Sequence, residues 1–115
     1  MTLRWRFDPP SDVKITAELR AAGERGLLLA AEFVLSVSDQ RVPLEWGTLA
    51  GSGETSVDGL TAAVSYGTAY AVRQHEELTY RHPNGRQAKY LETAFADSVD
   101  EVRAIIAAQL RRAFR

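Results

Sequence analysis

The sequence predicts an α+β fold, with a long N-terminal helix and a C-terminal helix packed on one face of a small, mainly antiparallel sheet. Two long segments repeat apolar residues at the spacing of an amphipathic helix. Between them, an Asp-Gly pair separates two short segments, the pattern of a β-hairpin. The length of 115 residues is typical of one domain.

The N-terminal segment is predicted to be a strand that leads to the long helix. Residues 2–7 alternate between apolar and other side chains, as in a strand with one buried face. The two prolines at 9–10 end this strand, because proline has no amide hydrogen to donate to a ladder. Ser11 or Asp12 is then expected to cap the helix.

The first helix is predicted from apolar residues that recur every three or four positions over about six turns. This stripe consists of Ile15, Leu19, Ala22, Gly26, Leu29, Phe33 and Val37. Further apolar residues widen it after Gly26, so the second half of the helix is expected to lie deepest. The helix should end before Pro43, because the residue that precedes a proline avoids the helical conformation.

Residues 51–57 and 60–66 are predicted to form the hairpin, since Asp58-Gly59 suits a two-residue type I′ turn. The N-terminal strand is expected to be the third member of the sheet. A short helix over residues 68–76 and a loop over 77–87 are expected next.

The last helix carries a second apolar stripe, formed by Leu91, Phe95, Val99, Val102, Ile106, Leu110 and Ala113. Ser98, with Glu101 three residues later, has the form of a capping box. We therefore expect the helix to be interrupted near Asp97.

Composition excludes several classes of function. The net charge is −1, with 14 Lys and Arg against 15 Asp and Glu, so non-specific DNA binding is expected to be poor. With no cysteine, disulfides and thiolate metal sites are excluded. The longest apolar run, residues 26–31, is shorter than the ~20 residues of a membrane span, and no signal peptide core is evident. We expect no membrane association.

Two groups of side chains allow more than one interpretation. The aromatic residues of the central region either anchor loops onto a small core or contribute to a subunit interface. They are Trp46, Tyr66, Tyr70, Tyr80 and Tyr90. The arginines near the end of the chain either suit the dipole of a helix C-terminus or face a phosphate or a partner. They are Arg103, Arg111, Arg112 and Arg115.

The residues that come nearest to a metal site are His75, Glu76 and His82, since imidazole and carboxylate are zinc ligands. The second histidine follows the first by seven residues, whereas the metalloprotease helix motif needs a spacing of four. We therefore expect both imidazoles to fix a loop through hydrogen bonds, with no cofactor and no bound metal. A small metal-dependent hydrolase is the enzymatic alternative.

Two blocks of sequence carry motifs in a fixed order. The first, P-x-x-x-G-x-L-x-x-S, is formed by Pro43, Gly47, Leu49 and Ser52. The second, Y-A-x-x-x-H-E followed by K-Y-L, is formed by Tyr70, His75, Glu76, Lys89, Tyr90 and Leu91. A polar loop that contains His82, Pro83 and Gly85 separates the two parts of the second block.

This order of motifs resembles the tail-completion (neck, or minor capsid) proteins of tailed bacteriophages, over residues 27–101. The resemblance implies a structural virion protein with no catalytic role. It would form a hexameric ring in the neck, between the portal complex and the tail terminator, after assembly in the host cytoplasm. Trp46 replaces the small polar residue common before this glycine in the family, which leaves the local turn open.

The same resemblance implies the partners and the role of the two blocks. The partners would be copies of the chain itself, head-completion or portal proteins, and tail-terminator proteins, with DNA passing nearby without specific binding. The motif residues would shape one interaction surface. A minor capsid protein attached to the shell is the nearest alternative, and a toxin-like or regulatory binding module is a more distant one.

Overall fold

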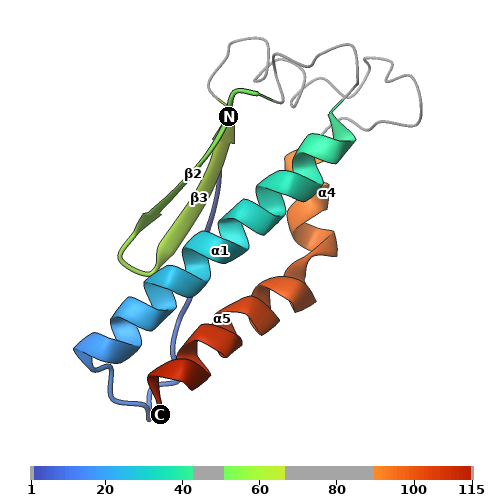
Figure 1. Cartoon of the computed structure of the whole chain (residues 1–115). Helices are drawn as coiled ribbons and strands as arrows, with labels where there is room; N and C mark the ends of the chain where they lie inside the picture. The colour runs from blue at the N-terminus through green and yellow to red at the C-terminus, as the bar shows by residue number, and fades with distance from the viewer. Residues whose placement is uncertain (1, 43–50, 67–89, 115) are drawn as a thin grey trace.

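The computed structural model describes residues 2–42, 51–66 and 90–114, which form an elongated α+β structure (Figure 1). Its principal extents are 49 × 22 × 22 Å, and its radius of gyration is 15.7 Å. A compact chain of this length has a radius of gyration of about 13 Å. The predicted fold class is confirmed, because a long N-terminal helix and a C-terminal helix pack with a three-stranded antiparallel sheet.

The sheet has the strand order β1-β3-β2, with β1 at Thr2–Arg6, β2 at Gly53–Asp58 and β3 at Thr61–Tyr66. Both pairings are antiparallel, so β1 and β2 run parallel on either side of β3. The hairpin and the third strand are confirmed. In the described part of the chain, β1 and β2 are the two edges of the sheet.

The hairpin turn lies one residue later than predicted. Asp58 pairs with Thr61 as the last residue of β2, so Gly59 and Leu60 form the loop. Gly59 has φ +61°, which a glycine at the first loop position adopts without steric cost. This register puts Ala62, Val64 and Tyr66 on the buried face of β3.

The long helix α1 spans Ala17–Arg41 and begins later than predicted. Its cap is Thr16, whose Oγ1 accepts a hydrogen bond from Leu19 N at 3.1 Å. Ser11 and Asp12 were the wrong choice, because they lie in a turn closed by a backbone bond from Val13 N to Pro10 O. The C-terminal end of α1 is as predicted.

The helix α1 packs against β2 and β3 on one side and against α4 and α5 on another (Figure 1). Its buried residues are Ala22, Gly23, Gly26, Leu27, Ala30, Ala31, Val34 and Ser38. The predicted stripe is wrong in part, because Leu29 is 48% exposed and Ile15 lies outside the helix. A helix that is covered on two sides buries a wide arc of its surface. The centre of this arc runs through residues such as Leu27, Ala30 and Val34, which were expected only to widen the stripe.

The C-terminal segment forms α4 at Tyr90–Asp97 and α5 at Val99–Ala113, so the predicted interruption is confirmed. The capping box is not formed, because Ser98 makes no side-chain cap hydrogen bond. Its backbone angles of φ −110° and ψ 8° differ from the extended conformation of an N-cap residue. None of the helices in residues 2–42, 51–66 and 90–114 is long and apolar enough to cross a membrane.

Candidate functional site

Three of the predicted site residues lie in the described part of the chain. Ser52 is half-buried, whereas Tyr90 and Leu91 are fully buried in the core. The others lie outside the described residues: Pro43, Trp46, Gly47, Leu49, Tyr70, His75, Glu76, His82, Pro83, Gly85 and Lys89. The expected helix over 68–76 and loop over 77–87 also lie outside them.

The fold brings the described residues that flank both motif blocks to one end of the molecule. Gly53, just after the first block, pairs with Tyr66, just before the second. Tyr66 in turn contacts both the C-terminal end of α1 and Tyr90, where α4 begins. We call the cluster of Ser38, Asp39, Tyr66 and Tyr90 the junction.

The centre of the junction is the hydroxyl of Tyr66, a residue that is only 1% exposed. Its oxygen lies 2.7 Å from Asp39 Oδ1 and 2.9 Å from Ser38 Oγ. A phenol has one proton, so Tyr66 donates to the carboxylate of Asp39 and accepts from the hydroxyl of Ser38. The rings of Tyr66 and Tyr90 meet edge to face, with centroids 5.5 Å apart. The strand β3, α1 and α4 are therefore held together at one point.

Burial raises the pKa values of three groups in the junction. It raises the pKa of Tyr66 far above its ordinary value, with the negative charge of Asp39 acting in the same direction. Burial, followed by the charge of Asp39, raises the pKa of Tyr90 to about 12. Burial also raises the pKa of Asp39, against the opposing effect of the hydrogen bond from Tyr66. Both phenols stay neutral at physiological pH, which suits a structural role.

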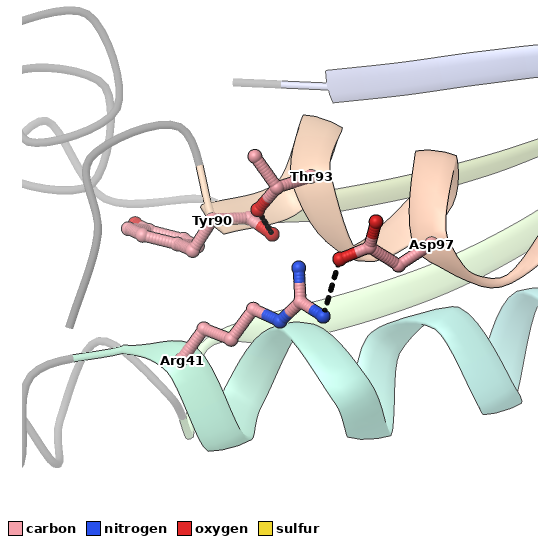
Figure 2. Close-up of polar contacts among 4 residues, drawn as sticks. All are labelled: Arg41, Tyr90, Thr93 and Asp97. Carbon is pink, nitrogen blue, oxygen red and sulfur yellow. Dashed lines mark hydrogen bonds and ion pairs between the residues drawn. The ribbon is translucent and has the colours of Figure 1, made fainter. Parts of the chain in front are cut away.

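A second contact fixes α4 against α1 beside the junction (Figure 2). Arg41, in the last turn of α1, forms an ion pair with Asp97 at 2.8 Å. Thr93 Oγ1 donates to the carbonyl oxygen of Tyr90 at 3.2 Å, within α4. Asp97 is largely exposed, so the ion pair itself contributes little stability, although it favours one orientation of the two helices.

The sequence analysis identified two of the four residues of the junction. Tyr66 and Tyr90 are core residues, as the loop-anchoring interpretation of the aromatic residues predicted. Ser38 and Asp39 were missed. The available signal was the position of Ser38, four residues after Val34 on the buried arc of α1, where a polar side chain needs a partner.

The described residues form no group of side chains suited to hold a metal ion. In residues 2–42, 51–66 and 90–114, no three His, Cys, Asp or Glu side chains gather as a metal ion requires. The predicted alternative based on His75, Glu76 and His82 lies outside these ranges.

Replacement of Tyr66 with phenylalanine is expected to lower the free energy of unfolding by about 1 kcal/mol, because Asp39 and Ser38 lose their shared partner. Urea denaturation at neutral pH measures this effect. The control is Ser36→Ala, which removes an exposed hydroxyl of the same helix and should change stability by less than about 0.5 kcal/mol. Equal effects of the two substitutions would contradict the assigned role of the junction.

The buried tyrosines predict a loss of stability at alkaline pH. The folded pKa of Tyr90, about 12, exceeds its ordinary value of 10.0. The resulting stabilisation is fully present below pH 10 and disappears as the pH rises through about 12. Urea denaturation at several pH values above 9 should therefore show a steeper decline for the wild type than for Tyr90→Phe. Parallel declines would mean that Tyr90 ionises as readily in the folded chain as in the unfolded one.

Comparison of the chain with protein-family models, with curated proteins and with solved structures finds no match.

Proposed function

We propose that this protein is a structural component of a tailed-phage virion, a head-to-tail connector subunit that assembles as a ring between the portal complex and the tail terminator. The motif order of the two sequence blocks suggests this class. One observation in the structure supports it best: the junction gathers the described residues that flank both blocks at one end of an elongated fold. The described residues on either side of both blocks therefore lie together at the junction.

Such an arrangement suits a contact surface supported by a rigid scaffold. Tyr66 and Tyr90, which flank the second block's first part, are buried, and Leu91, the last residue of the K-Y-L motif, packs in the core. Binding residues are often carried by connecting segments that a packed core positions. The motif residues would then contact neighbouring virion proteins, with no bond made or broken.

Two further properties agree with a ring subunit. The sheet has two edge strands in the described part of the chain, and edge strands offer backbone groups for pairing with a neighbour. The net charge of −1 gives the subunit little attraction for DNA that must move past it.

Binding to phage heads tests the proposal. Purified protein is mixed with portal-bearing heads that lack tails, sedimented and examined by electron microscopy, with heads that lack the portal as the control. Binding at the portal vertex supports a neck position. Binding to both kinds of head supports the minor capsid alternative, and absence from heads and from intact virions would overturn the structural assignment.

A further inference from the structure

The end of the molecule opposite the junction carries an apolar pocket, which we call the socket. Nine apolar residues and Arg20 line it, with a volume of about 150 Å³. Its walls come from the segment before α1, the start of α1, the hairpin turn and the end of α5, and they include Phe7, Val13, Leu60 and Phe114. A cavity of similar volume in another protein holds benzene, so the socket has room for an aliphatic side chain.

The socket lies beside apolar groups that water reaches. Phe114 is 71% exposed and Val13 is 39% exposed, although both belong to its walls. Exposed apolar surface gathered around a pocket is the usual mark of an interaction site. Burial of Phe114 against a partner removes from water an aromatic side chain of the kind that dominates interfaces.

A complementary surface lies on the same chain, in the middle of α1. Leu28 and Leu29 are 42% and 48% exposed, although they are adjacent large apolar residues. Glu24 and Glu32 lie four residues before and after Leu28, on the same side of the helix. We call these four residues the ridge.

The charges around the socket and the ridge have opposite sign. Arg20 lines the socket, and Arg111 and Arg112 are exposed in the last turn of α5, between the socket residues Leu110 and Phe114. The ridge carries Glu24 and Glu32, with Arg25 as a partly opposing charge. Asp12 and Glu18 partly oppose the cations at the socket, Lys14 adds to them, and Asp8 is paired with Arg6. The balance favours contact of the ridge with the socket over contact of either surface with itself.

We propose that the socket of one copy receives the ridge of a second copy, with Leu28 or Leu29 in the pocket and Glu24 and Glu32 facing the arginines. Because the socket and the ridge are different surfaces, each copy contacts one neighbour through its socket and a second neighbour through its ridge. Such a head-to-tail contact produces a closed ring when its rotation closes and a filament when it does not. This inference rests on the proposed ring function and names the contact that would build the ring.

Two variants separate the surfaces. Phe114→Ser removes the exposed wall of the socket, and Leu28→Ser with Leu29→Ser removes the apolar part of the ridge. Sedimentation velocity is expected to show concentration-dependent oligomers for the wild type and at least tenfold weaker association for each variant. The control, Ala104→Ser, changes an exposed residue of α5 and should assemble as the wild type does. Circular dichroism checks that all variants keep the wild-type fold.

A mixture of the two variants gives the sharpest result. The ridge variant keeps an intact socket and the socket variant keeps an intact ridge, so the mixture forms one complete contact and stops at a 1:1 dimer. The dimer should dissociate several-fold more readily in 0.5 M salt than in 0.05 M salt, because salt screens the charges. Variants that assemble normally, or a mixture that stays monomeric, would overturn the assignment.

The outcome separates this inference from the proposed function. If the wild type binds heads and both variants assemble normally, then the connector function is supported and the contact between socket and ridge is refuted. If the wild type forms oligomers that the variants weaken, but never binds heads, then the contact is supported and the connector function is refuted. A wild type that is monomeric, and that loses head binding through Phe114→Ser, would assign the socket to another virion protein and overturn the inference.

Discussion

Replacement of Leu91 with alanine is expected to lower the free energy of unfolding by about 2–5 kcal/mol. Leu91 belongs to the K-Y-L motif, yet it is fully buried among the core residues of α1, β3 and α4. Truncation removes buried apolar atoms and leaves a cavity that a packed core fills only in part. Chemical denaturation measures the loss.

The control for Leu91 is the same truncation at Leu29, which is 48% exposed. Leu29→Ala should change stability by about 0.5 kcal/mol or less while it weakens association between copies. The pair therefore distinguishes a core residue from a contact residue. A Leu91→Ala protein with wild-type stability and defective head binding would show that this leucine acts through a partner and not through the core.

Replacement of Gly26 with alanine is expected to cost about 2 kcal/mol of stability. A Cβ at this position would lie 2.9 Å from the Cα of Ile106, where α1 and α5 cross. The backbone of α5 has to move, so the cost is expected at the upper end of the range for overpacking, about 3 kcal/mol. The better helix propensity of alanine offsets about 1 kcal/mol of that cost. Thermal and chemical unfolding both report the balance.

Gly23 offers a matched control one turn earlier on α1. A Cβ there would lie 3.2 Å from Leu60 Cδ2, the tip of a side chain that can rotate away. Gly23→Ala is therefore expected to fall within about 1 kcal/mol of the wild type, because the helix propensity gain and the small steric cost nearly cancel. If alanine at both glycines has the same effect, then the close approach of the helices at Gly26 is not what limits substitution.

The elements of this fold could be predicted because their signals are local. The alternation in residues 2–7 and 60–66 follows from the geometry of a strand with one buried face. The break between α4 and α5 was also visible, as a residue with capping chemistry inside an apolar stripe. Neither prediction needed knowledge of what packs against the element.

The errors arose where distant contacts decide the outcome. Leu29 fits a helical period as well as Leu27 does, and only the position of α5 and the sheet determines which of them is buried. The partnership of Tyr66 with Ser38 and Asp39 joins residues from separate elements, so no local pattern announces it. The motif blocks support only a proposal about the class of protein, while the junction was found in the fold.

The strand order also bears on how the chain reaches its native state. β2 and β3 are neighbours in sequence and can pair early, whereas Leu3 finds Val64 only after the whole of α1 has been made. Closing so long a loop costs entropy and slows the search. Of the three described strands, β1 is made before β2 and β3 and is expected to pair last, so its apolar face stays unpaired until β3 has been synthesised.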